Sequence, residues 1–497
     1  MKTPESERHL LSKSTFMMGL QCPKRLWLYK NKPELRPEIS ESQQMVFTKG
    51  TNTGLLAQQL FPAGKDATPV DYFSYPQAIM QTFDWINSGE KIIYEASFQY
   101  DRVMAALDIL VSKNGKWHAY EVKSSTEVKD QFIKDAALQY YVITNAGLLL
   151  EDISIIHLNN EYVKEGSLNL EELFTIVSVK KEVLALQADI KNWIAENKRT
   201  LQLKSEPVKD IGPRCSDPYE CEFMGHCWQH IPEVSVFNLT RLTGTKKFEL
   251  YYDGILDFHE IPEGYSLTAS QQLQVKAKLE NYTHIEPENI QNWIKQLKNP
   301  LYFMDFETFM PAVPLYDNSR PYQQIPFQFS VHIQNAPDSN IDHYAFLGEP
   351  VSDPREEFIR QLINATKGTG SIIVYNKAFE STRLRELQEL YPEYSKKIDR
   401  IIDRIVDLME PFQKKWYYTS SMNGSYSIKL VLPALVPEMS YDELEIGEGG
   451  SAMAAFEGLL NITDKAEKQK IRNALLDYCK LDTWAMVSIL GKLKPVI

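Results

Sequence analysis

Two short stretches of the chain, residues 107–111 and 119–123, are largely apolar, with a few charged positions between the apolar ones. Asn114-Gly115 lies between them. Asn-Gly between two such runs is a strong hairpin signal, because both residues accept the positive φ angle of a tight turn. The pattern therefore predicts two antiparallel strands, preceded by a further strand over residues 91–100.

The predicted hairpin gathers charged side chains on one face. Side chains alternate along a strand, so Glu121 and Lys123 face the side opposite Tyr120. Asp108 lies near the middle of the partner strand and can reach the same face. Two carboxylates and an ammonium at this spacing can hold a divalent cation and direct a water onto a phosphate. A solvated hairpin that carries an ordinary Glu and Lys is the alternative.

The segments around the hairpin add helices and two polar candidates. Residues 128–144 carry apolar side chains at helical spacing, and Gln139 belongs to this helix. A strand over residues 153–158 follows, and residues 170–198 predict a long, charged amphipathic helix. Glu95, on the strand before the hairpin, is either an additional metal ligand or a plain edge-strand residue.

Asp108 followed by Glu121-Val122-Lys123, with Gln139 on the next helix, resembles the core motif of the RecB-like branch of the PD-(D/E)XK nucleases. The resemblance implies a restriction-endonuclease-like mixed sheet and Mg²⁺ or Mn²⁺ bound by Asp108 and Glu121. It also implies that Lys123 orients or activates the attacking water, or stabilises the phosphorane charge, and that Gln139 assists.

The chain departs from this family pattern at one ligand. Several RecB-like nucleases place a metal-binding His on an earlier helix, but Ala57 or a neighbour stands at the matching position. No His occurs in residues 10–117. The metal shell is therefore one ligand short, and the number of bound ions stays open.

Cysteines form the second clear pattern. Cys215, Cys221 and Cys227 fall within thirteen residues, and three soft thiolates at this density suit zinc or an iron–sulfur cluster. Cys22 can supply a fourth ligand from far upstream. One Cys before the nuclease core and three after it resembles the iron–sulfur branch of RecB-like nucleases, which implies a [4Fe–4S] cluster. Zn²⁺ and unliganded thiols are the alternatives.

A second set of acids follows in the last third of the chain. An apolar run ends in Asp305-Phe306-Glu307, which places both carboxylates on one face of a strand. A buried strand over residues 372–375 leads into a helix that carries Glu380. Near the end of the sequence, Tyr478 and Asp482 are four residues apart, on one face of a helix.

This order of blocks resembles the DnaQ-like exonucleases of the ribonuclease H-like fold, in the subtype whose last block is Tyr-x-x-x-Asp. The resemblance implies up to two divalent ions about 3.5–4 Å apart, with Tyr478 positioning the water. The implied ligands are Asp305, Glu307, Glu380 and Asp482. The second block normally ends in Asp, and Asp407 is a rival for the position assigned to Glu380. Residues 300–497 also resemble a bacterial domain family of unassigned function.

Three further stretches carry weaker signals. Residues 239–255 are faintly similar to a helix-hairpin-helix repeat, and a plain helical connector explains them better. The Pro-rich loop between Thr308 and Phe327 opens at the acidic residues and is a candidate substrate lid. Residues 414–418 mix lysines with aromatic rings, as in a stacking platform for single strands or in an ordinary core.

Composition limits the classes of function. The chain has 497 residues, enough for two or three domains, and a net charge of -12. The acidity argues against non-specific coating of DNA and leaves a local basic groove as the expected contact surface. Residues 1–8 are polar, and no apolar run reaches the ~20 residues of a membrane helix. We therefore expect a cytoplasmic protein without membrane contact.

Together these patterns predict an α/β protein of two nuclease-type domains joined by a helical connector. The RecB-like domain is expected over residues 1–232, the connector over 233–299 and the DnaQ-like domain over 300–497. The expected function is metal-dependent hydrolysis of DNA that is single-stranded or has a free end, in repair or defence against foreign DNA. The alternatives are a non-catalytic nucleic-acid-binding scaffold and a ribonuclease that uses only the C-terminal site.

Overall fold

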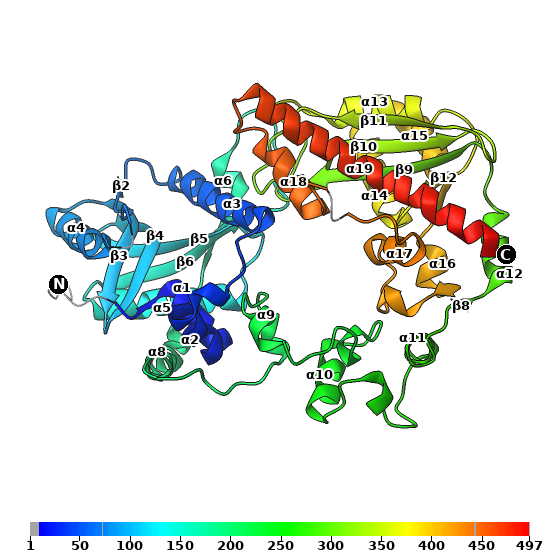
Figure 1. The fold of residues 1–497 in the computed structure, drawn as a ribbon. Coiled ribbons are helices and arrows are strands. Elements are labelled where there is room, and N and C mark those ends of the chain that lie inside the picture. Colours follow the sequence, from blue (N-terminus) through cyan, green and yellow to red (C-terminus); the bar gives the residue numbers. More distant parts are fainter. Residues whose placement is uncertain (1–8, 72, 442–443, 497) are drawn as a thin grey trace. The chain divides into compact units, whose positions relative to one another are not determined.

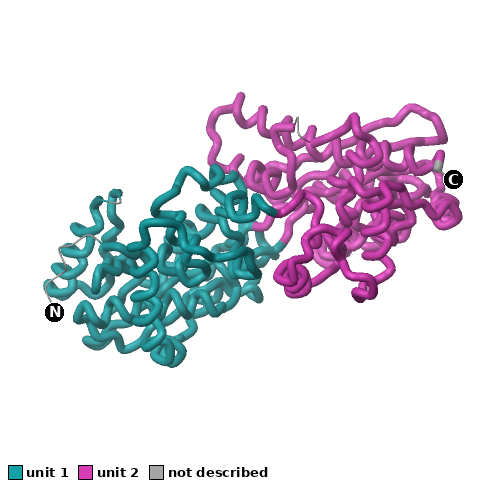
Figure 2. Tube along the Cα trace, turned by 60° about the horizontal axis from the view of Figure 1, so that its bottom comes forward, with its two compact units in different colours: residues 1–230, 311–323 teal, residues 231–310, 324–497 magenta. Residues whose placement is uncertain are grey.

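The computed structural model describes residues 9–71, 73–441 and 444–496. The chain forms two compact units, each of mixed α/β structure (Figures 1 and 2). The first unit is Met1–His230 together with Pro311–Gln323, and the second is Ile231–Met310 together with Gln324–Ile497. Residues 1–8, for which the sequence predicts no signal peptide, lie outside the described residues.

The first unit is built on a seven-stranded sheet of order β2-β3-β4-β5-β6-β7, with β1 paired to β4. The strands are β1 (Leu11–Ser12), β2 (Lys65–Asp66), β3 (Ile92–Tyr100), β4 (Val103–Lys113), β5 (Lys116–Lys123), β6 (Leu150–Leu158) and β7 (Phe174–Ser178). Asn114 and Gly115 join β4 to β5 with φ angles of 52° and 77°, which confirms the predicted hairpin. β6 runs parallel to β5, so the chain crosses over through α5.

Helices cover both faces of this sheet. They are α1 (Lys13–Gln21), α2 (Pro23–Asn31), α3 (Glu41–Gln58), α4 (Tyr75–Ser88), α5 (Asp130–Asn145), α6 (Leu170–Leu173), α7 (Lys180–Ala185), α8 (Gln187–Leu201) and α9 (Met224–Cys227). One hydrophobic cluster joins α1, α4, α5 and α8 to one face, and a second joins α3 to the other. On β5, Ala119 belongs to the first cluster and Tyr120 to the second. Glu121 therefore faces the side covered by α1 and α5, as the alternation predicts.

The expectation of one long helix over residues 170–198 is wrong. This segment contains α6, then the strand β7, then α7 and α8. The run Thr175-Ile176-Val177-Ser178-Val179 is rich in β-branched residues, which favour a strand. It pairs antiparallel with β6 and extends the sheet.

The second unit is built on a five-stranded sheet of order β11-β10-β9-β12-β13. The strands are β9 (Leu301–Phe309), β10 (Ile325–Gln334), β11 (Ile341–Leu347), β12 (Ile372–Val374) and β13 (Ile405–Asp407), while β8 (His284–Ile285) and β14 (Tyr417–Tyr418) form a separate pair. β10 is antiparallel to both of its neighbours, and β12 and β13 continue parallel to β9.

Successive side chains of β9 point to opposite faces of the sheet. Tyr302, Met304 and Phe306 pack into the hydrophobic core with α13, α14 and α15, whereas Asp305 and Glu307 face the side of α18 and α19. The helices of this unit are α10 (Gly244–Tyr252), α11 (Ala269–Leu279), α12 (Pro287–Ile294), α13 (Arg355–Ala365), α14 (Lys377–Leu390), α15 (Ser395–Ile402), α16 (Glu410–Gln413), α17 (Ile428–Leu435), α18 (Gly449–Gly458) and α19 (Lys465–Leu493).

The structure bears on the helix-hairpin-helix and stacking-platform interpretations. Over residues 233–268, all of them described, α10 is the one α-helix, so the two helices of a helix-hairpin-helix repeat are not formed. In the aromatic stretch, Tyr418 is 1% exposed and Lys415 is buried with its ammonium 3.9 Å from the Tyr418 ring centroid. These two side chains belong to the core, whereas Trp416 and Tyr417 are half-buried and Lys414 is exposed, so the stacking platform stays a prediction.

Most of the Pro-rich loop belongs to the first unit. Pro311–Gln323 packs within the first unit. The Tyr322 hydroxyl donates to the Ser124 carbonyl at 2.8 Å, and Lys164 Nζ forms an ion pair with Asp317 at 2.6 Å. The prolines stiffen a loop that is anchored beside the end of β5, and its role as a lid stays a prediction. Across the described part of the chain, no helix combines the length and apolarity that a membrane crossing requires.

Candidate functional site

Glu121 lies at the middle of the N-terminal centre, which we define by Asp108, Glu121, Lys123 and Gln139. Its side chain is 1% exposed. Oε1 accepts hydrogen bonds from Lys123 Nζ at 2.7 Å and from Lys13 Nζ at 2.6 Å, and Oε2 accepts one from Gln139 Nε2 at 2.7 Å. The predicted residues Glu121, Lys123 and Gln139 therefore meet, and Lys13 joins them from α1.

Asp108 lies beside Glu121 on the neighbouring strand. Its Oδ2 accepts a hydrogen bond from the backbone N–H of Val122 at 2.5 Å. Burial, and then the nearby charge of Glu121, raise the pKa of Asp108 to about 7. The two carboxylates share one face of the hairpin, as the sequence predicts, and they repel each other when both are ionised.

Asp135 on α5 is a member of this centre that the sequence analysis missed. It is 6% exposed, and its Oδ2 lies 2.5 Å from Lys123 Nζ. Burial lowers the pKa of Lys123, but the charges of Asp135 and Glu121 outweigh it and the net pKa rises. Lys123 is therefore a fixed positive charge here. Asp135 precedes Gln139 by one helical turn, and that spacing was the available signal.

Glu95 reaches the same centre through an irregularity in β3. The register of β3 on β4 skips Glu95, whose φ angle is 51°. The pairs on either side keep one register, so Glu95 lies opposite Asp108 with no inserted residue, and a positive φ at a residue other than Gly is strained. Burial, followed by the charge of Asp108, raises the pKa of Glu95 to about 8. β3 lies between β2 and β4, so Glu95 is not an edge-strand residue, and its role as a ligand stays a prediction.

Ala57, at or near the position where several RecB-like nucleases carry a metal-binding His, is buried in the hydrophobic core. Ala57 near the end of α3 is 0% exposed and belongs to the same hydrophobic cluster as Tyr120. That cluster lies on the face of the sheet opposite the acids. Glu95 and Lys13 are therefore the groups that complete the N-terminal centre.

The four cysteines of the predicted cluster line one pocket. Lys24, Arg25 and Arg214 line it as well. Burial raises the pKa of Cys221 to about 11, so a metal that binds these thiolates must displace protons. Among the described residues, no three of the cysteine sulfurs lie within 4.8 Å of one another. A tetrahedral zinc with ~2.3 Å bonds would hold its sulfurs about 3.8 Å apart.

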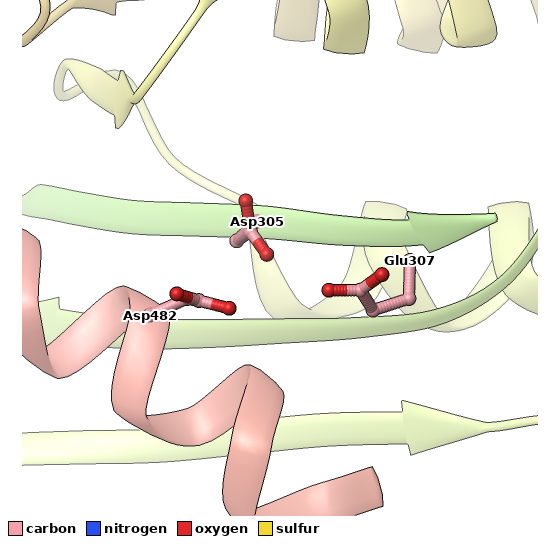
Figure 3. Close-up of side chains that lie close together, drawn as sticks. All are labelled: Asp305, Glu307 and Asp482. Atoms are coloured by element: carbon pink, nitrogen blue, oxygen red, sulfur yellow. The ribbon is translucent and has the colours of Figure 1, made fainter. Parts of the chain in front are cut away.

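The C-terminal centre, defined by Asp305, Glu307 and Asp482, is a compact group of carboxylates. Their ligand oxygens all lie within 4.8 Å of one another. Figure 3 shows Asp305 and Glu307 projecting from β9 and Asp482 from α19 into the same space. The predicted convergence of an Asp-x-Glu strand with the last helix is present.

Burial is the largest cause of the pKa shifts of these three carboxylates. Desolvation, followed by the charge of Asp482, raises the pKa of Asp305 well above its usual range. Burial and the charge of Asp305 do the same to Glu307, and burial raises the pKa of Asp482 to about 6. The ammonium of Lys429 partly offsets the shifts at Glu307 and Asp482. Three carboxylates that are costly to ionise together form a strong site for a divalent cation.

Two tyrosines hold Asp482. The Tyr441 hydroxyl donates to Asp482 Oδ1 at 2.7 Å, and the Tyr478 side chain also hydrogen bonds to this carboxylate and lowers its pKa. Tyr478 is the predicted residue. Tyr441 was missed because it lies in the irregular segment between α17 and α18, where no periodic pattern marks it.

Glu380 and Asp407 are the two candidates for the second acidic block, and their contacts favour Glu380. Glu380 is 1% exposed, its Oε2 has no hydrogen-bond partner among the described residues, and Asp305 contributes to raising its pKa after burial. Asp407 instead accepts hydrogen bonds from the backbone N–H groups of Asn376, Lys377 and Met409, at 2.9–3.1 Å. Asp407 therefore shapes the turn into α14. Glu380 is not within the 4.8 Å group.

Two further elements border the C-terminal centre. Lys429, in the first turn of α17, donates from Nζ to the Gly447 carbonyl at 2.9 Å. Gly449 begins α18, and a Cβ atom added there would lie 3.9 Å from Glu307 Oε2. The Nζ donors of Lys429 and the N-terminal end of α18 are thus the positive groups nearest to the acids.

Comparisons with known proteins place the chain beside proteins without an assigned activity. A family described as "Domain of unknown function (DUF2779)" matches residues 302–427, which include β9 and most of the second sheet. The chain is 30% identical over 225 residues to the uncharacterized protein MG366 of Mycoplasma genitalium, covering 41% of this chain and 33% of the relative. It is 31% identical over 225 residues to the uncharacterized protein UU173 of Ureaplasma parvum, covering 41% and 32%. The matched region spans about a third of the length of these relatives.

Proposed function

We propose that the chain is a metal-dependent nuclease that hydrolyses phosphodiester bonds of DNA, with cleavage from a free end as the expected mode. The observation that carries the proposal is the group of Asp305, Glu307 and Asp482, whose ligand atoms lie within 4.8 Å of one another; Glu307 and Asp482 are buried and Asp305 is half-buried. Hard carboxylate oxygens in such a group suit Mg²⁺ or Mn²⁺. The partner-free, buried Oε2 of Glu380 is a further acceptor that an ion or its water would satisfy.

The residues around the acids have defined roles in this proposal. A divalent ion held by the three carboxylates supplies Lewis-acid activation of a water and of the phosphate. Tyr441 and Tyr478 fix the orientation of Asp482, and Tyr478 is placed to hold the attacking water. Lys429 contributes a positive charge that stabilises the additional negative charge of the pentacovalent phosphate.

The N-terminal centre is proposed as a second metal site. Asp108 and Glu121 are its ligands, with Glu95 as a third carboxylate. Lys123 stays protonated because Asp135 and Glu121 raise its pKa. Lys123 therefore stabilises charge on the phosphate and does not remove a proton from the water.

Strand topology supports the two domain types. The order β3-β4-β5 followed by α5 and a parallel β6 is compatible with a restriction-endonuclease-like core. The order β11-β10-β9-β12-β13, with β10 antiparallel to the other strands, is compatible with a ribonuclease H-like sheet. Repair of DNA or defence against foreign DNA is the setting that the sequence resemblance implies.

A [4Fe–4S] cluster is the proposed occupant of the cysteine pocket. Among the described residues, no three of the sulfurs lie within 4.8 Å of one another, whereas a closed zinc site would bring all four to about 3.8 Å from one another. The basic side chains of Lys24, Arg25 and Arg214 line the pocket and offset the negative charge of a thiolate-bound cluster. Cys22 precedes α2 while the other ligands follow α8, so the cluster joins the two ends of the first unit.

A second candidate function uses the C-terminal centre alone. Among the described residues, only this centre gathers three acidic ligands within 4.8 Å, whereas Glu121 is engaged by Lys13, Lys123 and Gln139. A single-site deoxyribonuclease or ribonuclease would show this asymmetry. If the C-terminal centre were inactive as well, the protein would be a non-catalytic scaffold that only binds nucleic acid.

End-labelled single-stranded DNA, double-stranded DNA and RNA, incubated with the protein in Mg²⁺, Mn²⁺ or EDTA, test the proposal. We expect stepwise shortening of DNA in Mg²⁺ or Mn²⁺ and none in EDTA. Shortening of RNA alone would support the single-site ribonuclease. Binding without cleavage in every metal would leave the scaffold and overturn the proposal.

A further inference from the structure

Lys13 reaches the N-terminal centre from a segment 108 positions before Glu121. It is the first residue of α1 and follows β1, which pairs with β4 through Leu11 and Ser12. Ser12 caps the helix through a reciprocal pair of hydrogen bonds with Thr15. A lysine in the first turn is unfavourable to the helix dipole, so the acids of the centre must compensate for its charge.

The contacts of Lys13 differ from those of Lys123. Lys13 Nζ lies 2.6 Å from Glu121 Oε1, the oxygen that Lys123 also binds, and 4.0 Å from Asp135 Oδ2. Lys123 Nζ lies 2.5 Å from the same Asp135 oxygen. Lys123 therefore has two carboxylate partners within hydrogen-bond distance, and Lys13 has one.

This difference decides what happens when a divalent ion binds Glu121. The ion and the two ammonium groups repel one another. Lys123 keeps Asp135 at hydrogen-bond distance, whereas Lys13 loses its one hydrogen-bonded carboxylate and is left with Asp135 at 4.0 Å. In a nuclease, the phosphate of the substrate would offer Lys13 a closer anion than Asp135.

We infer that Lys13 is a second catalytic lysine of the N-terminal centre, paired with Glu121 in the metal-free protein and with a non-bridging oxygen of the scissile phosphodiester once the ion is bound. The inference rests on the proposed nuclease function. It predicts that removal of Lys13 has opposite effects on two properties. The metal should bind more tightly, because a competing cation is lost, and cleavage should slow, because the phosphate loses a charge-assisted donor.

The test uses the full-length chain with Asp305→Asn and Glu307→Gln, which remove the C-terminal ion site. In this background, Lys13→Met, Lys13→Arg and the exposed control Lys30→Met are compared. Mn²⁺ binding is followed by electron paramagnetic resonance, single-turnover cleavage of DNA at saturating Mn²⁺ by gel, and folding by thermal unfolding. We expect Lys13→Met to tighten Mn²⁺ binding at least about fivefold and to slow cleavage about 100-fold. Lys13→Arg should recover part of the rate, and Lys30→Met should change neither property.

Cleavage by Lys13→Met at the rate of the background protein would overturn the inference. So would unchanged or weaker Mn²⁺ binding together with slower cleavage, since a purely structural lysine predicts that combination. If the background protein binds Mn²⁺ and cleaves DNA, a failure concerns Lys13 alone. If it neither binds Mn²⁺ nor cleaves, the proposed N-terminal centre falls and the role of Lys13 falls with it.

Discussion

Asp305 on β9 and Asp482 on α19 bring their carboxylate oxygens within 4.8 Å of each other. Burial and the charge of Asp482 raise the pKa of Asp305. The metal-free centre therefore carries repulsion that opposes folding, and a divalent cation would remove it. In the proposed function, the same geometry makes the centre a weak point of the metal-free fold and a site for an ion.

Replacement of Asp305 should separate these two effects. Asp305→Asn removes one of the repelling charges, so we expect the metal-free protein at pH 8 to gain about 1 kcal/mol of unfolding free energy. We also expect Mg²⁺ to stabilise this variant far less than the wild type. Urea unfolding with and without Mg²⁺ measures both changes, with the exposed Glu263→Gln as a matched control. Equal stabilisation of wild type and Asp305→Asn by Mg²⁺ would contradict the assignment.

The pH dependence of stability follows from the direction of the shift at Asp482. Its pKa rises from 3.8 to about 6 on folding, so the native state binds more protons than the unfolded state between these values. Stability contributed by this group is present at low pH and is lost as the pH rises from about 4 to about 6, by at most about 1.4 kcal/mol per pH unit. We expect Asp482→Asn to flatten the fall in unfolding free energy over this range in metal-free buffer. An unchanged slope would show that Asp482 titrates normally.

The N-terminal centre should respond differently, because Glu121 is paired with lysines. Burial raises the pKa of Glu121, but Lys123 and Lys13 outweigh it and the net pKa falls. Glu121→Ala leaves two partly buried ammonium groups without this partner and should cost about 3–5 kcal/mol of unfolding free energy. Lys13→Met in the same chain should recover part of the loss, which a double-mutant cycle measures. Additive effects of the two substitutions would contradict the ion pair, and the exposed Glu127→Ala serves as the control.

The cysteine pocket gives a prediction that can be seen directly. Protein purified without oxygen should be brown, with thiolate-to-iron charge-transfer absorption and about four iron atoms per chain, as a [4Fe–4S] cluster requires. Cys221→Ser should lose the colour and should also destabilise the first unit, because the cluster joins its two ends. One zinc per chain without iron would replace the iron–sulfur proposal.

The sequence predicted the elements that obey a simple period. The Asn114-Gly115 hairpin, the strand that carries Asp305 and Glu307, and the helix that carries Asp482 all follow from alternation or helical spacing. The same patterns brought Asp108, Glu121 and Lys123 to one face. These residues were predictable because local geometry fixes where their side chains point.

The residues that were missed depend on tertiary structure. Lys13 and Tyr441 arrive from a helix start and an irregular segment that are brought to the acids by packing. Over residues 170–198, the charged residues suggested one long helix. Phe174–Ser178 instead forms the strand β7, because its β-branched residues favour a strand and β6 pairs with it.

The most direct test of the account is metal-dependent cleavage of end-labelled DNA by four proteins: wild type, Glu121→Gln, Asp305→Asn and the double variant. We predict that each single substitution removes one component of the cleavage and that the double variant is at least about 10³-fold slower than the wild type in Mg²⁺ or Mn²⁺. Circular dichroism confirms that each variant is folded. Cleavage by the folded double variant at the wild-type rate would contradict the claim that these carboxylates form the active centres.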